Sequence, residues 1–269
     1  MIVGSYAAIG DSFSEGMGDE LPDGSPRGWA DLVALGLAAA HAAAHAGEAA
    51  DGGRAQPFGY ANFAIRGRLL GPILAEQLQP AIALGPELLT INGGGNDIMR
   101  PRVSVAATAD RLVAAAGEAT AAGIRVAIVS GADPTRHIPL GPFIKARGDE
   151  LALAVRERLA GTGVVYIDNW SDAALTDLRY WSVDRLHLNA LGHARVAGNV
   201  LAGLGVEVPE AAHAPHGDGE PDIARPRTAE YWRQYVLPWI GRRLTGRSSG
   251  DGRTAKRPTL LPVELPGSF

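Results

Sequence analysis

The chain has 269 residues, of which 46% are hydrophobic, and a formal net charge of -4. That length and hydrophobic content suffice for one large domain with a full core. The absence of cysteine excludes disulfides and thiolate metal sites, and the small net charge points to no particular class of partner.

Neither a membrane span nor an export signal is evident in the sequence. No run reaches the ~18 apolar residues that a membrane span needs. The first residues lead into an apolar run without a basic region or a small-residue cleavage site. We therefore expect no membrane span and a cytoplasmic protein.

Five short apolar runs alternate with longer helical patterns. None of the runs alternates apolar and polar residues, which is typical of strands buried on both faces. This order indicates an α/β fold in which a parallel sheet has helices on both faces. The expected strands are Tyr6–Ile9, Tyr60–Ile65, Leu88–Asn92, Val126–Ser130 and Val164–Ile167. The expected helices are Trp29–His45, Leu69–Leu84, Val103–Ala122, Pro142–Leu159 and Ala190–Leu204.

The regular alternation stops after the last of these helices, so residues 1–204 form the predicted main domain. Residues 205–228 are dominated by Pro, Gly, Glu, Asp and His, which predicts a linker or a loosely ordered segment. Residues 229–269 follow as a basic, aromatic C-terminal helix and tail. Ala229–Leu244 has a helical period that Pro238 must kink or restart, and beyond it we expect irregular structure.

The charge is divided unevenly along the chain. Residues 225–257 hold nine Lys or Arg against two acidic residues, so this segment carries about +7 and the remainder about -11. Such a segment can dock on its own acidic body, associate with a second copy, or meet nucleic acid or an anionic surface. We expect docking or self-association and no nucleic-acid binding, because one helix face is apolar and no nucleic-acid motif is evident.

The stretch from Gly10 to Gly16 follows the first predicted strand directly. It breaks into small and polar residues, so Ser12 should lie on the turn from the first strand to the first helix. In open α/β sheets, reactive groups gather outside the carboxyl ends of the strands. Ser12 is therefore a candidate nucleophile, provided that a base and oxyanion donors lie nearby.

Acyl transfer from a serine needs a base, a group that orients the base, and donors for the oxyanion. Asp184 and His187 lie three residues apart, so one helical turn places the carboxylate beside the imidazole. Asn96 can donate a side-chain N–H, and the backbones of Gly67 and Ser12 can donate theirs. All of these residues stand at predicted strand ends.

Four segments, in this order, resemble the SGNH hydrolases, the GDSL esterase/lipase superfamily. The resemblance covers about residues 4–204. Phe13 stands where the Gly-Asp-Ser-Leu motif that names the superfamily has Leu. The residues that match are Gly10, Asp11, Ser12, Ser14 and Gly16 in the first block, Asn62, Ala64 and Gly67 in the second, Gly94, Gly95, Asn96 and Asp97 in the third, and Asp184 and His187 in the last.

The resemblance implies a three-layer α/β/α fold with a five-stranded, flavodoxin-like parallel sheet and no metal. It gives Ser12 the role of nucleophile, His187 that of base and then acid, and Asp184 that of orienting group. The Ser12 N–H, the Gly67 N–H and the Asn96 amide would form the oxyanion hole. We therefore predict a serine esterase that hydrolyses a small or medium acyl ester through an acyl-enzyme on Ser12.

Two other functions stay open. A carbohydrate or metabolite O-deacetylase or acyltransferase would use the same residues, because loops choose the acyl acceptor. A non-catalytic binding module would keep the fold and use the basic tail to hold RNA or anionic lipid. The intact candidate site argues against this alternative. The acyl chain length and the natural alcohol are not determined by the sequence.

Several polar residues are expected to have structural roles only. His41 and His45 have metal-ligand spacing, but no third ligand stands nearby, so we expect no metal. No dinucleotide fingerprint or phosphate loop is present, so we expect no cofactor. Asp11 should shape its turn, Asp97 should bond loop backbone, and His193 should pack or bond locally.

Overall fold

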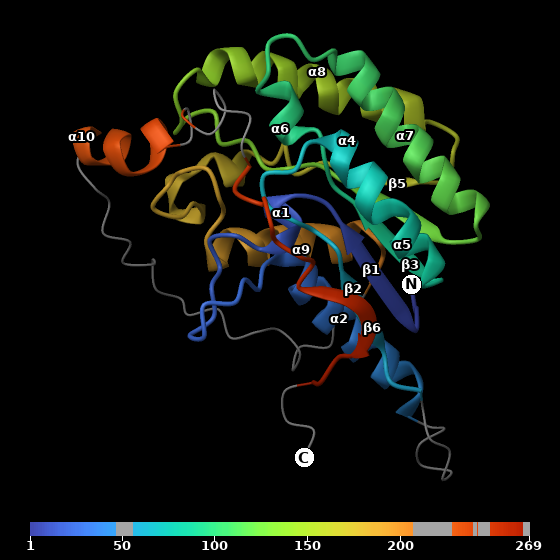
Figure 1. Ribbon diagram of the computed structural model, residues 1–269. Helices are drawn as coiled ribbons and strands as arrows, with labels where there is room; N and C mark the ends of the chain where they lie inside the picture. The colour runs from blue at the N-terminus through green and yellow to red at the C-terminus, as the bar shows by residue number, and fades with distance from the viewer. Residues whose placement is uncertain (47–55, 207–227, 239–240, 242–247, 266–269) are drawn as a thin grey trace.

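The computed structural model describes residues 1–46, 56–206, 228–238, 241 and 248–265. Its centre is a six-stranded sheet in the order β5-β4-β3-β1-β2-β6, with helices against both faces (Figure 1). The strands are β1 Ser5–Ile9, β2 Gly59–Asn62, β3 Leu88–Ile91, β4 Arg125–Val129, β5 Val165–Ile167 and β6 Arg257–Pro262. The helical segments are α1 Ser12–Glu15, α2 Trp29–Ala44, α4 Leu70–Ile73, η1 Leu74–Leu78, α5 Gln79–Ala83, α6 Gly95–Ile98, α7 Val105–Ala121, α8 Gly141–Leu159, η2 Ala173–Thr176, η3 Leu178–Tyr180, α9 Ala190–Gly203, α10 Thr228–Tyr231 and η5 Trp232–Val236.

The strand β1 lies inside the sheet and pairs in parallel with β2 on one side and β3 on the other. Successive side chains of a strand point to opposite faces. Tyr6 and Ala8 therefore enter the core formed with α2 and α9, whereas Ala7 and Ile9 enter the core formed with α4, α7 and α8. All four are fully buried. The predicted three-layer α/β/α arrangement is confirmed.

The helix predicted over Leu69–Leu84 is not uniform. It consists of α4, the wider π-helical turn η1, and α5. Pro80 has no N–H to donate to the carbonyl of Glu76, so the backbone widens just before the proline. None of the helices in the described ranges is long and apolar enough to cross a membrane.

The sheet has one strand more than predicted. β6 comes from the tail that was expected to be irregular, and it pairs antiparallel with β2 (Figure 1). Its sequence carries no strand signal, because its two prolines lack the N–H that a strand donates to its neighbour. Prolines are tolerated at the edge of a sheet, which is where β6 lies. The domain boundaries at residues 204 and 228 stay a prediction, since residues 207–227 lie outside the described ranges.

A lysine directly before β6 joins the C-terminal segment to the first part of the chain. Lys256 Nζ donates to the carbonyl oxygens of Glu15, Pro26 and Arg27 at 2.7, 3.0 and 2.7 Å, and to Asp31 Oδ2 at 2.6 Å. Burial raises the pKa of Asp31 to about 6, against the opposing attraction of Lys256. The ammonium group thus offsets part of the cost of burying this carboxylate.

Replacing Lys256 by Met should lower the free energy of unfolding by about 2–4 kcal/mol at neutral pH, because three carbonyl oxygens and a partly buried carboxylate lose their donor. Urea unfolding followed by circular dichroism measures the change. Arg253→Met, at an exposed position of the same segment, is the control and should change the free energy by less than about 0.5 kcal/mol. Equal stability of Lys256→Met and the wild type would contradict this role.

Candidate functional site

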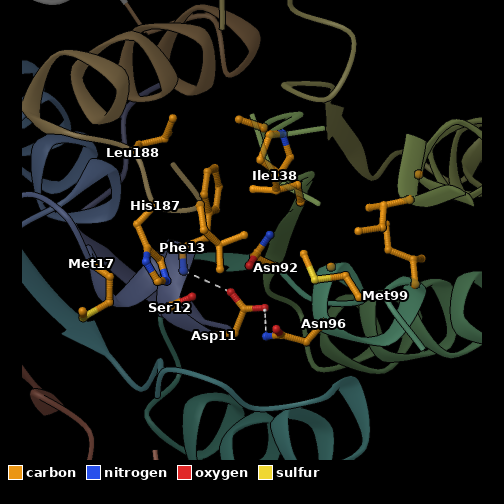
Figure 2. A pocket seen from close by; sticks show the side chains of 18 of the residues that line it. Asp11, Ser12, Phe13, Met17, Asn92, Asn96, Met99, Ile138, His187 and Leu188 are labelled. Carbon is orange, nitrogen blue, oxygen red and sulfur yellow. Dashed lines mark hydrogen bonds between the residues drawn. The ribbon is translucent and has the colours of Figure 1, made fainter. Parts of the chain in front are cut away.

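The residues predicted to act chemically meet at the carboxyl ends of the strands. Ser12 is the first residue of α1, directly after β1, and Asn96 lies in α6, directly after β3. Gly67 follows β2, and Asp184 and His187 lie in the loop before α9. All five residues line one pocket, and Figure 2 shows Ser12, Asn96 and His187 around it.

The carboxylate of Asp184 is bonded to both the ring and the backbone of His187. Oδ2 lies 2.5 Å from His187 Nδ1. Oδ1 accepts from the backbone N–H groups of Leu186 and His187, both at 3.0 Å, and from the hydroxyl of Ser182 at 2.7 Å. Because Nδ1 is bonded to the carboxylate, Nε2 is the ring nitrogen available for a substrate or a nucleophile.

These contacts shift the pKa values of the two groups in opposite directions. Burial alone would raise the pKa of Asp184, but the attraction and hydrogen bonds of His187 hold it well below its usual range. Burial alone would lower the pKa of His187, but Asp184, with a smaller contribution from Asp11, raises it above 6.5. The pair therefore combines a charged carboxylate with a strengthened base.

The predicted oxyanion donors differ in their present bonding. The backbone N–H groups of Ser12 and Gly67 donate to no acceptor within the described residues. The side-chain nitrogen of Asn96 donates to Asp11 Oδ2 and to the carbonyl oxygen of Arg68, both at 3.1 Å. A substrate oxygen would therefore share or take over one of the two bonds made by Asn96.

Gly67 stands where the C-terminal segment meets the candidate site. Its φ of 72° lies in the left-handed region that favours glycine. A Cβ atom at this position would lie 2.5 Å from Ser248 Oγ and 2.8 Å from Ser249 Oγ. Both serines line the pocket. No local sequence pattern predicts this contribution.

Asp11 and Asp97 lie next to predicted site residues and accept hydrogen bonds from neighbouring groups. Asp11 caps α1: its Oδ1 accepts from the backbone N–H of Phe13 at 3.0 Å, and its Oδ2 accepts from Asn96 (Figure 2). Burial raises the pKa of Asp11 to about 6. Asp97 bonds backbone, as predicted, but at a helix start and not in a loop: it accepts from the N–H of Leu70, the first residue of α4, at 2.9 Å.

Sequence reasoning missed a buried support of the loop that carries Ser12. Gln77 is 2% exposed; it accepts from the N–H of Gly10 at 2.8 Å and donates to the carbonyl of Gly10 at 3.0 Å. An amide within an apolar helical pattern is the signal that could have marked it, because a buried amide needs partners.

His193 packs in the interior, as expected, but its hydrogen bonds go to residues far away in the chain. Its ring is fully buried, Nδ1 accepts from the backbone N–H of Trp29 at 3.1 Å, and Nε2 donates to the carbonyl oxygen of Met17 at 3.0 Å. One nitrogen accepts and the other donates, so the ring is neutral. Burial lowers the pKa of His193 to about 4.

The pocket that Ser12 lines has a volume of about 300 Å³. Aliphatic side chains from α6 to α8 and the adjoining loops form much of its wall, namely Ile98, Met99, Leu112, Ile138, Ile144, Leu151, Ala152 and Val155. The C-terminal segment forms another part, with Tyr231, Gln234, Tyr235, Val236 and Pro238. The cavity is therefore a product of the main domain and the tail together.

Within the described ranges, no group of three or more His, Asp or Glu residues is placed to hold a metal ion. The histidines with metal-ligand spacing are bonded to backbone carbonyl oxygens. His41 Nε2 lies 3.0 Å from the oxygen of Gln56, and His45 Nδ1 lies 2.8 Å from that of His41.

A serine, a histidine and an aspartate meeting in one pocket is the arrangement of a serine hydrolase. A profile of the GDSL-like Lipase/Acylhydrolase family matches residues 8–195. The chain belongs to this family of ester-cleaving hydrolases.

Solved structures share this fold at low sequence identity. The lipase Lip_vut3 from a goat rumen metagenome is 16% identical, with 74% of this chain and 96% of that chain covered and a TM-score of 0.56. A catalytic mutant of Axe2, an acetylxylan esterase from Geobacillus stearothermophilus, is 19% identical, with 78% and 99% covered and a TM-score of 0.58. TesA is 22% identical, with 74% and 97% covered and a TM-score of 0.52. No curated protein sequence gives a significant match.

The buried neutral ring of His193 should make the folded protein less stable as the pH falls. In the unfolded chain this histidine takes up a proton near pH 6.5, whereas the folded ring resists protonation down to about pH 4. Its contribution is fully present above pH 6.5 and is lost as the pH falls toward 4. His193→Gln, whose amide can accept from Trp29 and donate to Met17, should remove this pH dependence.

Urea unfolding of both proteins at a series of pH values tests this expectation. The other titrating groups are common to the two proteins, so the difference between their free energies of unfolding isolates His193. A difference that stays constant across this pH range would show that the ring is not held neutral.

Proposed function

We propose that this chain is a serine esterase that cleaves a small or medium acyl ester through an acyl-enzyme on Ser12. The observation that carries the proposal is the 2.5 Å contact between Asp184 and His187, made in the pocket that Ser12 also lines. Membership of an acylhydrolase family supports the same reaction class.

In this mechanism Ser12 Oγ attacks the carbonyl carbon of the ester, and His187 Nε2 takes the hydroxyl proton. Asp184 keeps Nδ1 protonated and stabilises the imidazolium. The N–H groups of Ser12 and Gly67 and the amide of Asn96 donate to the oxyanion. The bond to the alcohol oxygen then breaks as His187 returns the proton to it. A water molecule, deprotonated by His187, then attacks the acyl carbon. The bond to Ser12 Oγ breaks as His187 returns the proton to that oxygen, and the acid is released.

The cavity beside Ser12 favours an aliphatic acyl group. Its volume of about 300 Å³ lies at the lower end of ligand pockets, which measure about 300–1,000 Å³. An acetyl group would leave the aliphatic part of the pocket wall without contacts, so we infer a longer, medium acyl chain. Transfer of the acyl group to another alcohol is the alternative, and it would use the same residues.

Ser12→Ala should lower kcat for p-nitrophenyl butyrate by about 10³-fold or more, because it removes the hydroxyl that is proposed to form the acyl-enzyme. Ser14→Ala is the matched control, since the Ser14 hydroxyl has no hydrogen-bond partner in the described part of the chain, and it should keep its activity. Mass spectrometry after rapid quenching should find the acyl adduct on the wild type alone.

Undiminished turnover by Ser12→Ala would refute the proposal. The same assay with acetate, butyrate and octanoate esters tests the acyl group: a kcat/KM that is highest for acetate would contradict the inferred longer chain.

The rate should rise with pH as His187 loses its proton, because only the neutral imidazole can accept the proton of Ser12. Asp184 raises the pKa of His187, so the midpoint of kcat/KM against pH should lie above 6.5. Asp184→Asn should lower the activity and move the midpoint of the residual activity downward. An unchanged midpoint in Asp184→Asn would exclude His187 as the titrating base.

A further inference from the structure

The helix of the C-terminal segment packs against the loop that carries the candidate base. Tyr231, at the end of α10, is 4% exposed and lines the pocket. It lies beyond residues 8–195, which match the family profile. The contacts of Tyr231 are therefore an addition made by this chain to the shared fold.

Tyr231 makes two contacts with the loop from Asp184 to His187. Its hydroxyl donates to the carbonyl oxygen of Asp184 at 3.2 Å. Its ring lies under the guanidinium group of Arg185, whose central carbon is 4.2 Å from the ring centroid. The two contacts therefore hold Asp184, the candidate orienting residue, and Arg185, which follows it toward the candidate base His187.

Arg185 adopts a backbone conformation that needs outside support. Its φ is 59°, in the left-handed region that costs a residue with a side chain free energy. Its Nε is buried and has no hydrogen-bond partner among the described residues. The ring of Tyr231 is an attractive surface for this guanidinium group, and it offsets part of the cost of keeping the turn in this shape.

The shape of this turn decides whether the carboxylate reaches the imidazole. The left-handed residue Arg185 lies between Asp184 and His187, and across it Oδ1 of Asp184 bonds the backbone N–H of His187 while Oδ2 bonds its ring. A change of φ at Arg185 would move both bonds at once.

We propose that Tyr231 is a positioning residue: it holds the turn from Asp184 to His187 in the left-handed conformation that joins the carboxylate to the base. The inference rests on the proposed function, because it assigns the base to His187. Misplacement of a catalytic group by about 1 Å can cost on the order of 10²-fold in rate. The C-terminal segment is then part of the active site rather than an attachment to it.

The test measures kcat, KM and the pH profile of full-length variants with p-nitrophenyl butyrate. Tyr231→Ala should lower kcat by about 10-fold to 100-fold and move the midpoint of the pH profile down toward 6.5, because His187 loses contact with Asp184. Tyr231→Phe keeps the ring and should lose less than Tyr231→Ala. Trp232→Ala is the control, since Trp232 is 41% exposed on the same helix, and it should match the wild type.

A second substitution separates positioning from general stability. Glycine adopts a φ of 59° without a steric cost, so adding Arg185→Gly to Tyr231→Ala should restore part of kcat and return the midpoint toward its wild-type value. If Tyr231→Ala does not fold, Tyr231→Leu takes its place. The loss should again exceed that of Tyr231→Phe, and Arg185→Gly should again restore part of it.

Two results would overturn the inference. One is a folded Tyr231→Ala or Tyr231→Leu protein with wild-type kcat and midpoint, and the other is a loss of the same size in Trp232→Ala. Ser12→Ala is assayed alongside, so that failure of this inference can be distinguished from failure of the proposed function. An active Ser12→Ala refutes the proposed function itself, whereas an inactive Ser12→Ala with unaffected Tyr231 variants refutes only the role of Tyr231.

Discussion

The parallel pairing of β1 with β2 and β3 is the constraint on which the rest of the structure depends. Because the three strands run in one direction, their carboxyl ends lie at one edge of the sheet. The segments that follow them bring Ser12, Gly67 and Asn96 to the same pocket. The crossover helices must then cover both faces, which creates the two cores on either side of Ala7 and Ala8. The position of the site thus follows from the topology.

Two carboxylates that line the pocket with Ser12, buried Asp11 and partly buried Asp184, have opposite electrostatic environments. The imidazole of His187 lowers the pKa of Asp184 and keeps it charged. Burial raises the pKa of Asp11 to about 6, and its hydrogen bonds go to backbone and to Asn96. Environments that push the pKa values of two such groups apart give them separate tasks. Here Asp184 is bonded to the ring of His187, whereas Asp11 is bonded to loop backbone and to the amide of Asn96.

The C-terminal segment contributes to the sheet, to the pocket and to the contacts of the turn that carries His187. β6 extends the sheet beyond β2, and Lys256 joins that edge to the loop after α1. Ser248 meets Gly67, and Tyr231 meets Asp184. These contacts involve different elements of the main domain, and together they place the segment around one wall of the pocket. The family profile does not extend to this segment.

The sequence by itself determined the parallel α/β fold and the grouping of the site residues, because buried strands and the short polar turns after them are local signals. The spacing of Asp184 and His187 predicted a helical turn, whereas a loop with Arg185 in the left-handed region joins them. The sequence did not determine β6, because the two prolines of this edge strand are untypical of a strand sequence. It also did not determine the partners of His193, Lys256 and Tyr231. Those contacts join residues far apart in the chain, and their free energy comes from burial and hydrogen bonding that exist only after folding. Only the tertiary structure decided that the tail completes the wall beside Ser12.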